Sequence, residues 1–196
     1  MCLQRKYRMA TILLSADRLR TGRIREVQTL LQPFRERGLP VPCQFVSVPG
    51  TSAKLIAANI RTSNAYDYKQ WWFPTWVSNI YAQYYEAWSQ ADAGRKYGLE
   101  RCYLSLARLG APDRGYESIV CVHCDPTCAE PEPLRSFKSG PHLHVELAEP
   151  PLPKCHFPLN LAQLGEVLSS AETVTRAMGS AVRVITDEVM RQYANL

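Results

Sequence analysis

Apolar residues recur along this chain with two different spacings, and the spacing predicts which segments are helices and which are strands. Residues 17–37 carry apolar side chains three and four positions apart with arginines between them, the pattern of an amphipathic helix. Pro33 falls inside this pattern and Gly38 follows it, so we expect a kink or an early end. The short apolar runs at residues 9–15 and 41–48 predict strands on either side of the helix.

The aromatic residues are concentrated between residues 71 and 88, where the spacing is four. Pro74 suits the first turn of a helix, and the apolar positions that follow it predict one helix with an aromatic face. Such a face can pack in the core, stack on bases or bind a partner helix. Residues 51–61 predict another short helix, so the first half of the chain, residues 1–98, is expected to be mainly helical. The residues that keep the spacing of four are Trp76, Ile80, Tyr84 and Trp88.

The second half of the chain, residues 99–196, has the pattern of a sheet followed by helices. Residues 102–109 and 118–124 flank a turn-rich segment and predict a β-hairpin. The proline-containing segment 125–140 predicts a surface loop, and residues 141–147 alternate polar and apolar side chains as a half-buried strand does. Apolar positions between residues 161 and 189 predict C-terminal helices, divided at the capping-box pattern of residues 169–172.

These elements predict an α+β fold in a single domain. We expect a small antiparallel sheet, made of the hairpin and the His-rich strand, packed against the aromatic helix and the C-terminal helices. The length of 196 residues and the 46% of hydrophobic residues suit one compact core.

Net charge and cysteine content indicate which partners and which cellular compartment to expect. The net charge is +5, and residues 1–37 hold nine Lys/Arg against three Asp/Glu. A basic end of this kind attracts nucleic acid, an acidic protein or an anionic membrane surface, or it is a solvated helix face. Seven scattered cysteines favour reduced thiols and a cytoplasmic location. We expect no membrane span, because no apolar run approaches the necessary length.

All four histidines lie between residues 119 and 160, and they are the candidate chemical site. In the predicted strand, His142, His144 and Glu146 share one face. Two imidazoles suit acid–base cleavage of RNA, in which one takes the proton of a 2′-hydroxyl and the other supplies one to the leaving oxygen. The predicted acid–base residues are His142 and His144, assisted by His123 or His156, with Lys138, Lys154 and Arg135 as the cations for phosphate.

The same stretch also supports two kinds of metal site, so the cofactor is expected to be none or zinc. An open transition-metal site would use His142, His144, His156 and Glu146. A structural zinc site would use Cys121, Cys124, Cys128 and Cys155, although Cys121 and Cys124 point to opposite faces of the predicted strand. Small buried thiols are the other explanation for these cysteines.

The order of parts from the hairpin onward resembles the TumE-type toxins of bacterial toxin–antitoxin pairs. The residues that carry the resemblance are Gly140-Pro141-His142-Leu143-His144, His156-Phe157 and the apolar helix positions Leu161, Leu164 and Leu168. It covers about residues 100–170, and the aromatic and basic first half departs from that pattern. The resemblance implies a ribonuclease-like activity.

The sequence therefore leaves two functions open. One is a ribonuclease-like toxin or antiviral defence effector that cleaves RNA with the histidine cluster, with or without a metal ion. The other is a non-catalytic, zinc-stabilised binding subunit of a larger protein or nucleic-acid complex, whose contacts come from the basic N-terminal helix and the aromatic stripe. The expected partners are accordingly RNA, a partner protein or both.

Overall fold

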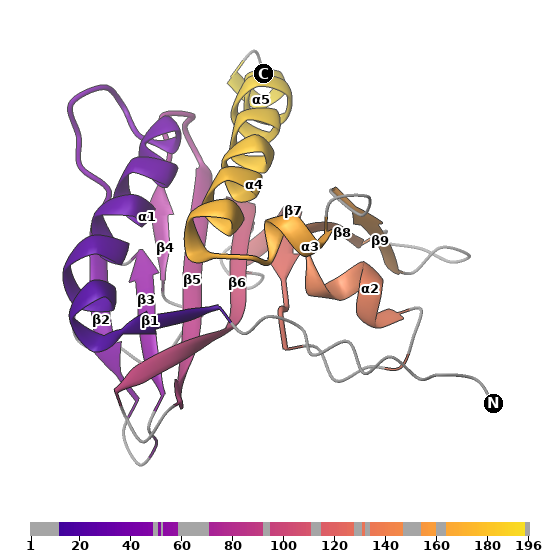
Figure 1. The fold of residues 1–196 in the computed structure, drawn as a ribbon. Helices are drawn as coiled ribbons and strands as arrows, with labels where there is room; N and C mark the ends of the chain where they lie inside the picture. Colours follow the sequence, from indigo (N-terminus) through magenta and orange to yellow (C-terminus); the bar gives the residue numbers. More distant parts are fainter. Residues whose placement is uncertain are drawn as a thin grey trace.

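The computed structural model describes residues 12–48, 51, 53–58, 71–91, 95–110, 115–127, 131, 134–146, 154–159 and 164–194. Within these residues, nine strands form one antiparallel sheet in the order β2-β3-β5-β6-β7-β8-β9, with β1 paired to β6 and β4 paired to β5 (Figure 1). The strands are β1 (Leu13–Ser15), β2 (Cys43–Ser47), β3 (Lys54–Ala58), β4 (Trp72–Pro74), β5 (Ile80–Ala91), β6 (Lys96–Leu109), β7 (Tyr116–Cys124), β8 (His142–Glu146) and β9 (Lys154–Pro158).

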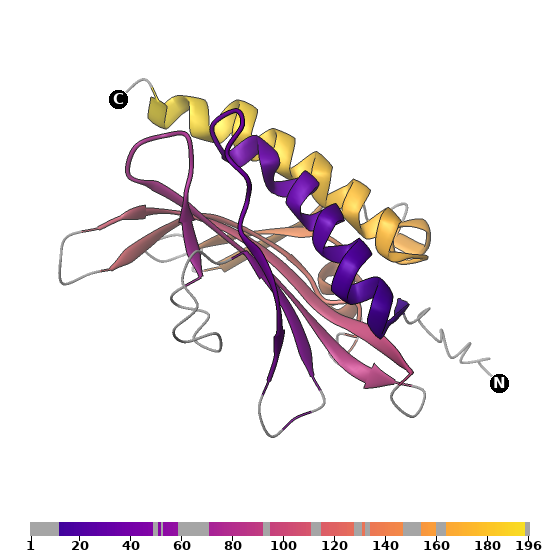
Figure 2. The same ribbon diagram turned by 90° about the vertical axis from the view of Figure 1, so that its left-hand side faces the viewer.

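Two long helical stretches cover one face of this sheet and lie side by side on it (Figure 2). The first joins η1, α1 and η2, and the second joins α4, η6 and α5. Short helices α2 and α3 lie near the β7–β9 end (Figure 1). The segments are η1 (Arg18–Arg23, π-helical), α1 (Ile24–Leu31), η2 (Gln32–Phe34, 3₁₀), α2 (Leu134–Ser139), α3 (Leu164–Val167), α4 (Ala171–Val184), η6 (Ile185–Met190, π-helical) and α5 (Arg191–Ala194). The α+β class, with an antiparallel sheet and C-terminal helices, is thus confirmed.

The predicted aromatic helix is wrong, because the segment forms strands β4 and β5. A spacing of four is also a multiple of two, so Ile80, Tyr84 and Trp88 share one face of a strand as well as one face of a helix. The two periods differ at the intervening positions. Ala82 and Glu86 are both fully buried beside the aromatic residues, as a strand requires and a helix does not. Trp76 lies before the strand, where its indole donates a hydrogen bond to the carbonyl of Pro33 (3.1 Å).

Three further segments also have a secondary structure different from the predicted one. Part of the helix predicted for residues 51–61 is strand β3, which lies between β2 and β5. With β1 to β5 in place, the described part of residues 1–98 is not mainly helical. The segment predicted as a loop at residues 125–140 includes α2, and the extended stretch after β8 includes strand β9.

The predicted break between the C-terminal helices is confirmed, but its chemistry differs in detail. Ser170 caps α4 by accepting a hydrogen bond from the amide of Thr173 (3.2 Å), and the Thr173 hydroxyl accepts one from the amide of Ser170 (3.0 Å). Thr173 therefore takes the reciprocal position that a glutamate or glutamine takes in the usual capping box.

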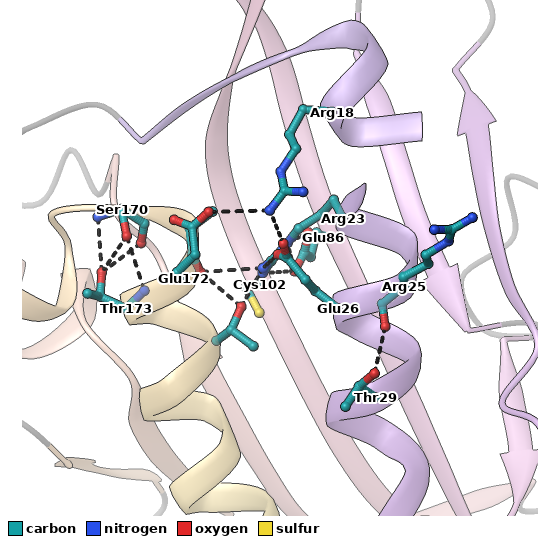
Figure 3. Close-up of polar contacts among 12 residues, drawn as sticks. Arg18, Arg23, Arg25, Glu26, Thr29, Glu86, Cys102, Ser170, Glu172 and Thr173 are labelled. Carbon is teal, nitrogen blue, oxygen red and sulfur yellow. Dashed lines mark hydrogen bonds and ion pairs between the residues drawn. The ribbon is translucent and has the colours of Figure 1, made fainter. Parts of the chain in front are cut away.

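A buried ion pair joins the two layers (Figure 3). The guanidinium of Arg23, in η1, donates hydrogen bonds to both carboxylate oxygens of Glu86 on β5, and both side chains are fully buried. Glu86 also accepts hydrogen bonds from the hydroxyl of Tyr84 and from the indole of Trp88 (2.9 Å). The same guanidinium reaches Thr175 on α4, so one arginine connects the first helix, the sheet and the last helix.

Among the described residues, no helix combines the length and the apolar character that crossing a membrane demands.

Candidate histidine site on the outer face of the sheet

The face of the sheet turned away from α1 and α4, here called the outer face, carries a row of rings across four neighbouring strands. Strand register places Tyr85 opposite Tyr103, Tyr103 opposite His123, and His123 opposite His142. The ring centroids of these pairs are 5.2, 4.0 and 5.7 Å apart. The ring of His144 stacks on that of His123 at 5.1 Å. Three of the four histidines, His123, His142 and His144, therefore lie together in the fold.

Asp125 completes this cluster. It follows β7 directly, two residues after His123, and its carboxylate accepts a hydrogen bond from the Tyr103 hydroxyl (2.8 Å). One ligand atom each from His123, Asp125 and His142 lies within 4.8 Å of the others. His142 is only 1% exposed, and its Nδ1 lies 2.9 Å from the carbonyl oxygen of Gly140. A carbonyl only accepts, so this bond assigns the proton to Nδ1 and the lone pair to Nε2.

Burial shifts the pKa of Asp125 and the pKa of His142 in opposite directions. Burial raises the pKa of Asp125, while the Tyr103 hydrogen bond and the charges of His142, Arg101 and Lys138 oppose that rise. Burial lowers the pKa of His142, while the Gly140 carbonyl and Asp125 oppose that fall. The cluster is thus partly removed from water, with two cations close enough to influence its carboxylate.

The predicted phosphate-binding cations have different positions. Lys138, at the end of α2, is half-buried and acts electrostatically on both Asp125 and His142. Arg135 lies on the same short helix, where its carbonyl accepts a hydrogen bond from the Ser139 hydroxyl (2.6 Å). Lys154 is the first residue of β9, and its side chain is outside the part of the structure that is described.

His156 and Glu146 complete the predicted open metal set, and only their main chains are described. The backbone of His156 pairs with that of His144, and the backbone of Glu146 pairs with that of Lys154. Their side chains lie outside the described part, so the predicted set of His142, His144, His156 and Glu146 stays a prediction.

Two of the four cysteines of the predicted structural zinc site, Cys121 and Cys124, have described side chains. Their positions do not support such a site. Cys124 is fully buried on the helix-covered face, where its thiol contacts the carbonyl of Ser139 (3.4 Å). Cys121 is on the outer face and donates a hydrogen bond to Ser105 (3.2 Å). Thiols on opposite faces of one strand cannot share an ion. Cys128 and the side chain of Cys155 are outside the described residues.

Three residues of the site were missed by the sequence analysis. Asp125 continues the alternation of Cys121 and His123 past the end of the strand, so the period of two could have identified it. Tyr103 and Arg101 lie on β6, and only the register between β6 and β7 places them beside the histidines. A single sequence does not reveal that register.

A second aromatic group lies farther along the outer face. The ring of Trp72 stacks on that of Tyr116 at 4.8 Å, and Tyr81 meets the edge of Tyr116 at 5.2 Å. Tyr116 is 39% exposed. We call Trp72, Tyr81 and Tyr116 the aromatic patch. The aromatic patch lies on the same face of the sheet as the histidine cluster. Trp72 is paired with Gln83, which is two residues from both Tyr81 and Tyr85, and residues two apart in a strand share a face.

Neither the family models, nor the curated proteins, nor the solved structures contain a match to this chain, so the case for the site rests on its own geometry.

Proposed function

We propose that the protein is a ribonuclease that holds an unpaired RNA strand on the outer face of its sheet and cleaves it at the histidine cluster. The observation that carries this proposal is the unbroken row of rings from Tyr85 through Tyr103 to His123, His142 and His144. Aromatic rings on a sheet face stack on bases whatever their sequence, and imidazoles transfer protons near neutral pH. Here a stacking surface leads directly to imidazoles.

RNA brings its own nucleophile to such a site. The 2′-oxygen attacks the adjacent phosphorus while the bond from phosphorus to the 5′-oxygen breaks, which leaves a 2′,3′-cyclic phosphate and a 5′-hydroxyl. One proton must leave the 2′-hydroxyl, and one must reach the departing 5′-oxygen. We assign the first transfer to His144 and the second to His123, because both are half-buried, whereas His142 is enclosed and fixed by Gly140.

The transition state carries negative charge on the phosphate oxygens, and two cationic side chains near the cluster can stabilise that charge. Arg101 is exposed on the outer face two residues from Tyr103, and Lys138 borders the cluster from α2. Preorganised positive charge of this kind stabilises phosphoryl transition states. The net charge of +5 also favours the approach of RNA.

The non-catalytic alternative predicts that the basic N-terminal helix carries the contacts, and three of its arginines already have intramolecular partners. Arg18 pairs with Glu26 and Glu172, Arg20 lies over the ring of Phe45, and Arg23 is buried against Glu86. Pairing within the chain leaves less of this helix for an acidic partner, which favours the outer face as the functional surface.

The experiment compares cleavage of a single-stranded RNA with that of the same sequence in a duplex. We expect the single strand to be cleaved with 2′,3′-cyclic phosphate ends and the duplex to resist, because its bases are not available for stacking. The variant Arg101→Gln should slow cleavage by about tenfold, or about 1.4 kcal/mol of transition-state stabilisation. Its matched control is Arg183→Gln, an exposed arginine on α4, on the other side of the sheet.

Two results would contradict the proposal. One is a folded protein that binds the single strand and leaves it intact, which is the behaviour of a binding subunit. The other is equal loss of cleavage in both arginine variants, which would attribute the effect to overall charge and not to the outer face.

A further inference from the structure

We propose that His123, Asp125 and His142 form a binding site for a divalent transition-metal ion, with zinc as the preferred occupant. Two imidazoles and one carboxylate are the protein ligands typical of open zinc sites, which keep a fourth position for water or substrate. The inference concerns the same cluster as the proposed ribonuclease but does not depend on RNA, because metal binding can be measured without it.

The ligands come from positions that the sheet holds rigidly. His123 lies in β7, Asp125 directly follows that strand, and His142 begins the adjacent strand β8, opposite His123. Their ligand atoms lie within 4.8 Å of one another. Ligands about 2.0–2.1 Å from a tetrahedral zinc are about 3.3 Å apart. The three groups therefore need to approach one another by at most about 1.5 Å, a movement that side-chain rotation supplies.

Two further contacts orient these groups as metal ligands are usually oriented. Metal-binding histidines commonly donate their second ring N–H to a carbonyl or carboxylate, and His142 does so to Gly140 through Nδ1. This leaves Nε2 with the lone pair that a metal requires. Ligating carboxylates are in turn hydrogen-bonded, and the Tyr103 hydroxyl donates to Asp125.

An ion at this position would add to the chemistry of the outer face. When bound there, it would supply Lewis-acid stabilisation of the charge on the leaving 5′-oxygen, and that oxygen would take its proton from water instead of from His123. His144 stacks on His123 but stands outside the three-residue set, and it would remain for the 2′-hydroxyl.

The test measures metal binding to the full chain after dialysis against a chelator. Titration calorimetry with zinc should give one equivalent bound and a higher melting temperature, and magnesium should not bind because it prefers oxygen ligands. Replacing zinc with cobalt should give visible absorption bands without the charge-transfer bands of thiolate ligands. Their absence would separate this site from binding by the free cysteines.

Three variants locate the site. Asp125→Asn keeps the shape of the side chain and removes its charge. It should weaken zinc binding by more than about 100-fold, because losing a metal ligand costs more affinity than losing a group that only hydrogen-bonds to a ligand. Tyr103→Phe removes only the outer hydrogen bond to Asp125 and should weaken binding by about 10–100-fold. His144→Ala is the matched control and should bind zinc as the unaltered protein does. Circular dichroism checks that each variant is folded.

Three outcomes would overturn the inference. The first is a folded protein that binds no stoichiometric zinc. The second is Asp125→Asn with undiminished affinity. The third is a cobalt spectrum dominated by thiolate bands, which would assign the metal to cysteines. Because none of these measurements includes RNA, failure of the metal site and failure of the proposed ribonuclease are distinguishable.

Discussion

The buried ion pair between Arg23 and Glu86 gives the most quantitative prediction for the fold. Both side chains are 0% exposed, and Glu86 accepts hydrogen bonds from Arg23, Tyr84 and Trp88. Glu86→Gln removes the charge and keeps the shape, so Arg23 loses its fully buried counter-ion. Removing one partner of a buried pair costs about 3–5 kcal/mol, because the other charge stays out of water. Arg23 keeps its ion pair with the partly exposed Glu26 (2.9 Å), so we expect a loss at the lower end of this range in the free energy of unfolding.

The double variant separates pairing from packing. Arg23→Met alone leaves the buried carboxylate of Glu86 without its counter-ion and should also lower the free energy of unfolding by about 3–5 kcal/mol. Arg23→Met combined with Glu86→Gln leaves neither charge unpaired. The double variant should therefore cost about as much as one single variant, with a coupling energy of about 3 kcal/mol between the sites.

Urea denaturation followed by circular dichroism and tryptophan fluorescence measures these differences. The matched control is the exposed pair of Arg108 and Glu117, with side chains 59% and 30% exposed. Glu117→Gln should cost less than about 1 kcal/mol, because water screens an exposed pair. The reasoning would be refuted if the double variant lost as much free energy of unfolding as the two single variants together. A Glu86→Gln cost as small as that of the control would also refute it.

Three further predictions concern the last helix and the aromatic patch. Ser170→Ala removes the N-cap of α4 and should lower the free energy of unfolding by about 1 kcal/mol in urea denaturation. The helix N-terminus and Ser170 lower the pKa of Glu172, so its ionised form stabilises the fold. The small stability difference between the unaltered protein and Glu172→Gln should thus be present at neutral pH and disappear as the pH falls below the ordinary carboxyl value of 4.5. Trp72→Ala should weaken binding of single-stranded RNA, measured by fluorescence anisotropy, by about 1–3 kcal/mol; unchanged affinity would exclude the patch from the binding surface.

Much of the second half of the fold could be predicted from the sequence, because its periods are unambiguous. The polar and apolar residues of β8 alternate strictly, and the three-and-four spacing of α4 fits only a helix. The first half was predicted less well, because Ile80, Tyr84 and Trp88 fit both periods. Tertiary context decides such a segment: β5 lies between β3 and β6 and is buried at successive even positions.

The histidine site was predicted in part for a similar reason. The local alternation placed His142 and His144 on one face, and a shared phase suggested His123. The position of Tyr103 depends on the pairing of β6 with β7, which is shifted by a bulge after Leu106. Long-range register of this kind is not encoded in any one segment, so the partner of Asp125 could not be found from the sequence.

Cleavage of a single-stranded RNA by His144→Ala, compared with the unaltered protein and Arg183→Gln, tests the central claim most directly. Each protein is assayed in its metal-free and zinc-loaded forms, and the ends of the products are identified. We predict that the unaltered protein and Arg183→Gln produce 2′,3′-cyclic phosphate ends, and that His144→Ala is slower by at least roughly 100-fold, the contribution expected of a proton-transfer group. Intact RNA in every sample, or equal rates for His144→Ala and the unaltered protein, would contradict a catalytic histidine cluster on the outer face.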